Sequence, residues 1–218
     1  MAARGVFVTG TGTEVGKTVV GAAIARTAAA RGERVTVFKP AVTGLDEEGE
    51  PDHAVLRRAA GSSQTDEEVA PYRYGPPVSP HLGAQLAGET ISAARLQAVA
   101  RAAGADVDLL VCEGVGGFLV PLTLGYLVRD LARDLGFPVV IAAGPGLGTI
   151  NHTLLTIESV RAVGLHVVAV VLTPWPAEPG EVERSNRETI ERLGAVAVQT
   201  LARLDLAEPG SWPELDPA

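Results

Sequence analysis

Short, almost entirely apolar segments alternate with longer helical patterns along this 218-residue chain. Strands made only of apolar residues, unlike strands that alternate apolar and polar residues, are typical of parallel sheets covered on both faces. We expect five such strands, at residues 5–9, 34–38, 108–113, 138–142 and 167–172. The pattern therefore predicts a doubly wound α/β fold, in which a mainly parallel sheet lies between two layers of helices.

Helical periodicity fills most of the chain between these strands. Helices are expected at residues 18–30, 92–103, 126–135, 150–163 and 181–193. The acidic, proline-rich segment 44–80 is expected to contain only one short helix, at 52–60, and long loops in compact domains are usually functional. The length fits one domain, 1–218, with residues 207–218 as an irregular tail.

Composition excludes several classes of protein. A formal charge of −8 without a basic cluster argues against a nucleic-acid partner. Cys112 is the only cysteine, so neither a disulfide framework nor a cysteine metal site is expected. No apolar run approaches the roughly 20 residues of a membrane span, and the first residues do not resemble a signal peptide. We expect a cytoplasmic protein without a membrane partner.

A glycine-rich turn, Gly10-Thr-Gly-Thr-Glu-Val-Gly-Lys-Thr18, connects the first strand to the first helix. It resembles the phosphate loop G-x-x-x-x-G-K-[ST], with the first glycine one position early. The backbone N–H groups of residues 14–18 can surround an anion at the helix N-terminus. Lys17 is expected to reach the β- and γ-phosphates of a nucleotide, and the Thr18 hydroxyl to bind Mg²⁺. Glu113, at the end of another strand, is a candidate second oxygen ligand.

Lysine is rare in this chain. Only Lys17 and Lys39 are lysines among 18 basic residues, and the other 16 are arginines. Because arginine otherwise supplies the positive charge, the two lysines indicate positions that need a compact ammonium group. Lys39 directly follows the strand 34–38, so we expect both lysines at the same edge of the sheet, facing one pocket.

Five segments together resemble the ATP-dependent dethiobiotin synthetase family, whose fold is like that of P-loop NTPases, with three α/β/α layers. They lie in family order at residues 9–18, 39–44, 79–81, 113–117 and 148–153. The resemblance implies a ligase of biotin biosynthesis that forms a carbamate from CO₂ and 7,8-diaminopelargonate. ATP phosphorylates this carbamate, and the second amine then closes the ring to give dethiobiotin, ADP and phosphate.

The resemblance also implies roles for individual residues. Lys17 and Lys39 would be catalytic, and Thr18, Asp52 and Glu113 would hold Mg²⁺, with Asp46 as an alternative to Asp52. The nucleotide would contact Glu14, Val15, Gly16, Lys17, Thr18, Val19, Asp52, Glu113, Gly114, Val115, Gly116, Thr173 and Pro174. The substrate would contact Thr13, Thr43, Gly148, Thr149 and Asn151, partly across the interface of a homodimer.

Some alternatives stay open. Thr173-Pro-Trp-Pro176 stands where the family often carries Asn-Asp to recognise adenine, so ATP is expected but other nucleoside triphosphates are possible. A partitioning or scaffold ATPase would carry a signature lysine at the position of Gly12. A relative that amidates a corrinoid acid would usually need a glutaminase domain. A nucleotide-binding module without enzymatic activity is a further alternative.

Overall fold

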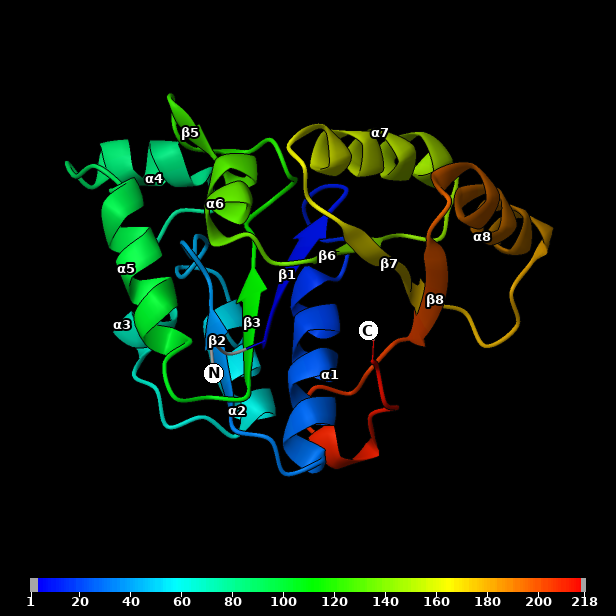
Figure 1. Ribbon diagram of the computed structural model, residues 1–218, viewed down its shortest axis with the longest axis horizontal. Helices are drawn as coiled ribbons and strands as arrows, with labels where there is room; N and C mark the ends of the chain where they lie inside the picture. Colours follow the sequence, from blue (N-terminus) through cyan, green and yellow to red (C-terminus); the bar gives the residue numbers. More distant parts are fainter. Residues whose placement is uncertain (1–3, 217–218) are drawn as a thin grey trace.

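The central element of the computed structural model, which describes residues 4–216, is a six-stranded parallel sheet (Figure 1). Its strands are β1 (Arg4–Gly10), β2 (Val35–Phe38), β3 (Leu109–Glu113), β6 (Val139–Ala143), β7 (Val167–Trp175) and β8 (Ala197–Ala202). They lie in the order β2-β3-β1-β6-β7-β8. The five expected strands and the parallel fold are confirmed, and β8 adds an unexpected strand at one edge. Strands β2 and β3 lie on one side of β1, and the strands of the sheet that follow them in the chain lie on its other side. The loop after β1 therefore lies at the switch point where such sheets bind ligands.

Helices cover both faces of this sheet and create two separate cores. One face is covered by α1 (Lys17–Ala30) and α2 (Asp52–Ala60). The opposite face is covered by α5 (Ala93–Ala103), α6 (Val128–Leu135), α7 (Thr149–Ala162) and α8 (Glu181–Gly194). The strands contribute side chains to both cores, which explains why they contain so few polar residues.

The segment 44–80 contains more regular structure than expected. Besides α2, it forms α3 (Asp66–Val69), so the expectation of a single short helix is wrong. The Thr65 hydroxyl accepts from the backbone N–H of Glu68, and the Glu68 carboxylate accepts from the N–H of Thr65. This reciprocal capping stabilises one helical turn that hydrophobic periodicity does not reveal. A further short helix, α4 (Pro80–Leu86), begins with proline at its first position.

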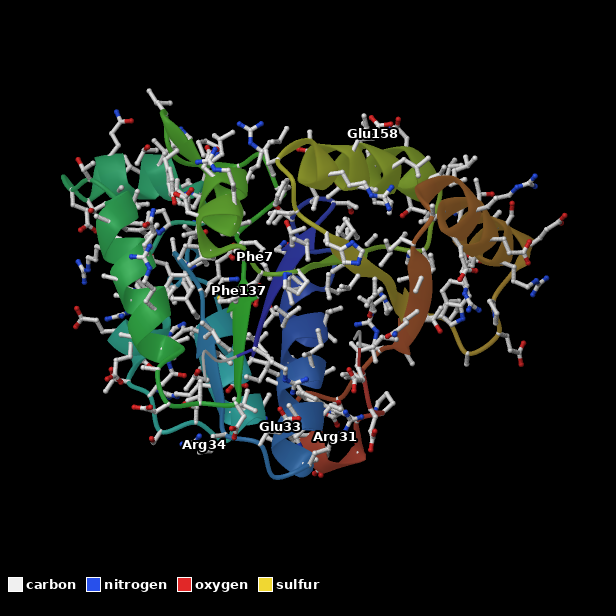
Figure 2. The ribbon with its side chains drawn as sticks, viewed as in Figure 1. Phe7, Arg31, Glu33, Arg34, Phe137 and Glu158 are labelled. Atoms are coloured by element: carbon white, nitrogen blue, oxygen red, sulfur yellow. The ribbon has the colours of Figure 1, made fainter. Side chains whose placement is uncertain are left out.

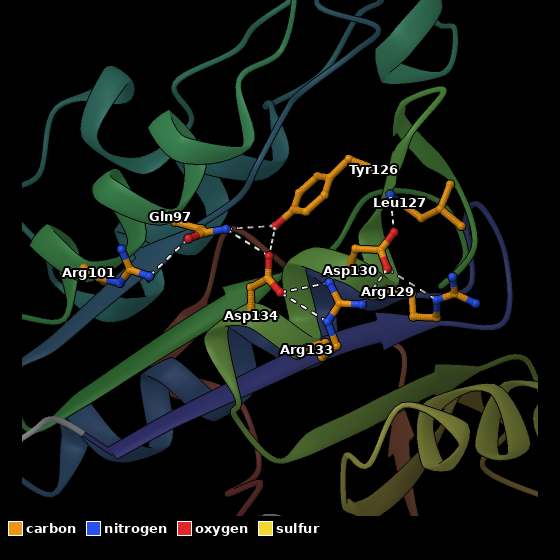
Figure 3. Close-up of polar contacts among 8 residues, drawn as sticks. All are labelled: Gln97, Arg101, Tyr126, Leu127, Arg129, Asp130, Arg133 and Asp134. Atoms are coloured by element: carbon orange, nitrogen blue, oxygen red, sulfur yellow. Dashed lines mark hydrogen bonds and ion pairs between the residues drawn. The ribbon is translucent and has the colours of Figure 1, made fainter.

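The expected helix 126–135 also begins later than predicted. Residues 126–127 form strand β5 (Tyr126–Leu127), which pairs with β4 (Pro121–Thr123) in a small hairpin. The backbone N–H of Leu127 donates to the Asp130 carboxylate (2.9 Å), so the helix begins at Val128. Figure 3 shows that the Tyr126 hydroxyl extends to Asp134, to which it donates (2.8 Å), and this bond fixes the hairpin beside α6.

The C-terminal segment packs against α1. After the 3₁₀ turn η1 (Pro209–Ser211), Leu215 is buried among apolar side chains of the α1 face, and its N–H donates to the Thr27 hydroxyl (2.9 Å). Arg31, at the end of α1 and labelled in Figure 2, forms ion pairs with Glu214 and Asp216. The last described residues therefore complete the core around the helix that follows the glycine-rich turn.

None of the helices within residues 4–216 is long and apolar enough to cross a membrane.

Candidate active site

The glycine-rich turn after β1 ends in a residue that has to be glycine. Gly16 adopts a left-handed backbone conformation (φ 86°, ψ 21°), and a Cβ atom there would lie 2.5 Å from Cγ2 of Thr173. Helix α1 begins at the next residue without a side-chain cap. The N–H groups of its first turn have no partner within the helix, and the helix dipole favours negative charge there. This end of α1 is therefore suited to binding a phosphate group.

Lys17 lies over this turn. Its side chain is only 7% exposed, and its ammonium group donates to the backbone carbonyl of Gly12 (2.8 Å). Burial lowers the pKa of Lys17, while the negative charge of Glu113 acts in the opposite direction. A lysine folded back over the turn in this way places a positive charge beside the free N–H groups, where phosphate oxygens would lie.

Lys39 bridges two carboxylates. It follows β2 directly and is 2% exposed, and its Nζ lies 2.5 Å from Oε1 of Glu113 and 2.8 Å from Oδ2 of Asp52. Burial would by itself lower the pKa of Lys39, but the two carboxylates outweigh it and raise that pKa. The ammonium group of Lys39 is therefore charged, and it holds together residues from α2 and β3.

The oxygen atoms around Lys39 fit a hard divalent cation. Glu113 is fully buried, its Oε1 accepts from the Thr18 hydroxyl (2.9 Å), and its Oε2 has no hydrogen-bond partner. Complete burial raises the pKa of Glu113, and Lys39 offsets part of that rise; Lys39 in turn lowers the pKa of Asp52. Two carboxylates, one of which has an unsatisfied buried oxygen, and a hydroxyl are the kind of ligands that Mg²⁺ prefers. The residues expected to hold Mg²⁺ are thus suited to it.

A cavity of about 720 Å³ opens at this edge of the sheet. Lys17 and Lys39 both line it, as predicted from the positions of the two strands that precede them in the chain. Other residues singled out from the sequence share this cavity: Thr13, Glu14, Gly16, Thr18, Val19, Thr43, Asp52, Val115 and Gly116. Asp52 lines the cavity and contacts Lys39, whereas Asp46 does not line it and packs against Gly75. The structure therefore favours Asp52 over Asp46 as the acidic residue of this site.

Several lining residues were not singled out from the sequence. Most belong to the segment 44–80, whose length had indicated a functional role: Glu47, Glu50, Val55, Pro77 and Val78. Ser79 and Pro80 also line the cavity, and they belong to the segment 79–81 already noted for its resemblance to the family. Val120 follows the glycines after β3, and Leu206 comes from the C-terminal part of the chain. No motif marks Leu206, because only the packing of the chain brings it to this cavity.

Other candidate residues lie at the margin of the cavity or away from it. Val15 and Gly114 do not line it, and the Gly114 N–H donates to the carbonyl of Val8 (2.8 Å). Thr173 is buried against Gly16, and Pro174 follows it in β7 through a cis peptide bond. Gly148, Thr149 and Asn151 lie at the start of α7 and are not among the lining residues. In a single chain, the start of α7 is therefore separate from the main cavity.

Comparisons with known proteins agree with this geometry. A family profile described as an AAA domain matches residues 4–213. A protein of Rhodococcus erythropolis named ATP-dependent dethiobiotin synthetase BioD is 43% identical over 210 residues, which cover 95% of this chain and 89% of the relative. The chain belongs to the dethiobiotin synthetase family. Family members of the same name occur in two other bacteria. The protein of Anaeromyxobacter sp. strain K is 43% identical over 87% of this chain and 89% of the relative. The protein of Bacillus subtilis strain 168 is 34% identical over 89% of this chain and 85% of the relative.

Membership of the dethiobiotin synthetase family confirms the resemblance seen in the five sequence segments. The matches cover nearly the whole chain rather than the glycine-rich turn alone. They therefore extend beyond the general similarity that a phosphate loop creates among many nucleotide-binding proteins.

Proposed function

We propose that the protein is an ATP-dependent dethiobiotin synthetase that converts 7,8-diaminopelargonate, CO₂ and ATP to dethiobiotin, ADP and phosphate. The observation that carries this proposal is the meeting of two buried lysines beside the phosphate loop, in a chain whose relatives bear that name. Partitioning ATPases and corrinoid-amidating enzymes are not favoured, because the relatives are named as dethiobiotin synthetases.

Three bond-forming steps account for the products. One amine adds to CO₂ and loses a proton, which gives a carbamate. A carbamate oxygen then attacks the γ-phosphorus of ATP, and the bond to the β–γ bridging oxygen breaks to release ADP. Finally the second amine attacks the carbamate carbon, loses a proton and displaces phosphate, which closes the ureido ring.

The protein's contribution to these steps is positioning and charge. Lys17 lies over the phosphate loop, where it would contact the β- and γ-phosphates, and Lys39 would contact the carbamate and the γ-phosphate as negative charge moves between them. Fixed positive groups in a buried site need little reorganisation when the charge moves, and this is the main source of catalysis in phosphoryl transfer. Thr43 would donate to the carbamate or accept from an amine, and Thr13 would lie beside it in the cavity.

Thr18, Asp52 and Glu113 would hold Mg²⁺. A bound Mg²⁺ ion supplies positive charge to the phosphate oxygens of the nucleotide. The unsatisfied Oε2 of Glu113 and the adjoining Thr18 hydroxyl support this assignment. The rest of the nucleotide would lie along the loop residues 14–19 and along Gly114, Val115 and Gly116, with Thr173 and Pro174 near its base.

The substrate's carboxylate is proposed to bind at Gly148, Thr149 and Asn151 of a second copy of the chain. Leu147, just before α7, is 97% exposed, and Leu124, in the β4–β5 hairpin, is 90% exposed. The start of α7 and the β4–β5 hairpin lie at the edge of the sheet to which the strands point (Figure 1), and an interface between two copies there would bury both leucines. We expect sedimentation equilibrium to give twice the 22.5 kDa mass of one chain. A single-chain mass at the concentrations used for activity would contradict the dimer.

The direct test is an assay of purified protein with bicarbonate, 7,8-diaminopelargonate and each of the four nucleoside triphosphates. We expect dethiobiotin and a nucleoside diphosphate in equal amounts, and loss of the activity when EDTA removes divalent cations. ATP is the expected nucleotide. A protein that binds nucleotide but makes no dethiobiotin with any triphosphate would contradict the proposed function.

The ATP requirement supports a cytoplasmic location.

A further inference from the structure

The loop that connects β6 to α7, residues 144–148, is not held in place by its own side chains. Its sequence is Gly-Pro-Gly-Leu-Gly, and a Cβ atom added to Gly144 or Gly146 would meet no atom within 4 Å. Leu147 is almost fully exposed, and Gly148 has a left-handed backbone (φ 91°). With so little packing, a loop of this composition needs hydrogen bonds to keep one conformation.

Asn186 of α8 supplies two of these hydrogen bonds. Its side-chain amide Nδ2 donates to the carbonyl of Pro145 (2.9 Å) and to the carbonyl of Gly146 (3.1 Å). Asn186 is only 6% exposed and sits on the buried side of α8 together with Ile190 and Gly194, whereas most of the helix is exposed. A buried amide at a position that packing alone would assign to an apolar residue indicates a specific task.

These two bonds fix the direction of the neighbouring N–H groups. In a planar trans peptide the C=O and N–H bonds point in opposite directions. With the carbonyls of Pro145 and Gly146 directed toward Asn186, the N–H groups of Gly146 and Leu147 point away from α8. Neither N–H group has a hydrogen-bond acceptor among residues 4–216. The loop therefore presents free donors next to the N-terminus of α7. The Gly146 carbonyl also accepts from the Thr149 N–H (3.2 Å), so Asn186 shares the orientation of that peptide with the first turn of α7, while it alone holds the carbonyl of Pro145.

We propose that Asn186 is a positioning residue that orients the loop 144–148 to receive the carboxylate of the substrate. The inference rests on the proposed function, because it assigns the carboxylate to the start of α7. Asn186 itself does not touch the carboxylate. It acts through the backbone of the loop, which without it could rotate its N–H groups away from the anion.

Two substitutions test this role. Asn186→Asp is nearly isosteric but donates no hydrogen bond, and Asn186→Ala removes the amide. We expect both to raise the KM for 7,8-diaminopelargonate about 10- to 100-fold, with kcat changed much less, because orientation of the carboxylate is lost while the reacting amines are unaffected. The Kd for ATP should stay at the wild-type value, which also shows that the variants are folded.

A substrate analogue separates positioning from general loosening of the structure. 2,3-Diaminooctane carries the same vicinal diamine without the carboxylate, so its kcat/KM should be the same for wild type and both Asn186 variants. Ile190→Ala is the matched control, since it removes an equally buried side chain from the same helix without touching the loop. It should affect both substrates equally, without the selective rise in KM.

The possible results separate two kinds of failure. Suppose that the wild-type enzyme is active but its Asn186 variants keep the wild-type KM, or show the same fall in kcat/KM with both substrates. Either result overturns the role of Asn186 and leaves the proposed function intact. A wild-type protein that binds ATP but makes no dethiobiotin overturns both. A rise in KM confined to the carboxylated substrate supports the inference.

Discussion

Replacing Lys39 by methionine is expected to lower kcat by about 10²- to 10³-fold, the usual effect of removing one preorganised charge from a transition state. Methionine keeps the length and bulk of the side chain but removes the ammonium group. The Kd for ATP should change much less, because Lys17 and the loop backbone would still contact the phosphates. Steady-state kinetics together with equilibrium nucleotide binding would measure both quantities.

The same variant should bind a divalent cation more tightly than the wild type does. In Lys39→Met the carboxylates of Asp52 and Glu113 lose the ammonium that bridges them, and breaking a buried ion pair costs about 3–5 kcal/mol. A divalent cation can replace that charge, so Mn²⁺ alone should bind more tightly and should raise the unfolding temperature of the variant. Electron paramagnetic resonance of free Mn²⁺ and thermal unfolding would check both effects.

Lys17→Met is the matched control for cation binding. It removes the same charge from the same cavity, but the ammonium of Lys17 donates to Gly12 rather than to a carboxylate. We expect a smaller gain in Mn²⁺ affinity than for Lys39→Met. Equal gains in the two variants would mean that the total charge of the cavity, rather than the bridge made by Lys39, controls cation binding.

Replacing Gly16 by alanine is expected to weaken ATP binding about 10²-fold. The added Cβ would lie 2.5 Å from Cγ2 of Thr173, and a left-handed backbone costs a residue other than glycine about 1–2 kcal/mol. Both effects move the phosphate loop out of its conformation, and about 1.4 kcal/mol corresponds to a tenfold change in affinity. Isothermal titration with a non-hydrolysable ATP analogue would measure the change.

Two further variants separate the clash from the backbone strain. Thr173→Ser removes Cγ2, so the double variant Gly16→Ala/Thr173→Ser should recover roughly tenfold of the lost affinity. Gly32→Ala is the control for strain alone, because Gly32 has nearly the same φ (83°) but open space around it and does not line the cavity. It should reduce stability by about 1 kcal/mol and leave ATP binding unchanged. If the double variant binds no better than Gly16→Ala, the contact with Thr173 is not the cause.

The sequence predicted the part of the fold that depends on local patterns. Apolar runs identified β1, β2, β3, β6 and β7, because strands buried on both faces carry almost no polar residues. Strand β8 was missed because Gln199 and Thr200 interrupt its apolar run and its end residues Ala197 and Ala202 are exposed, whereas the other edge strand, β2, is mostly buried. The end of β7 was missed because Pro174 is unusual inside a strand.

The candidate site was predictable as a set of positions but not as a set of contacts. Lys39 directly follows one strand and Glu113 ends another, so the rule that ligands bind at the carboxyl ends of strands brought them together. That Lys39 bridges Asp52 and Glu113 depends on where α2 packs, which the sequence does not encode locally. Asn186 gave no signal at all, because an asparagine in a charged helix is indistinguishable from a solvent-exposed residue.

The C-terminal segment has a consequence for how the protein is made. Helix α1 is among the first elements to be synthesised, yet its core is completed by Leu215 and its last turn is paired with Glu214 and Asp216. Because proteins are synthesised from the N-terminus, this helix stays partly uncovered until residues 214–216 have been translated. A chain that lacks residues 214–216 would therefore lose support for the helix that begins its phosphate site.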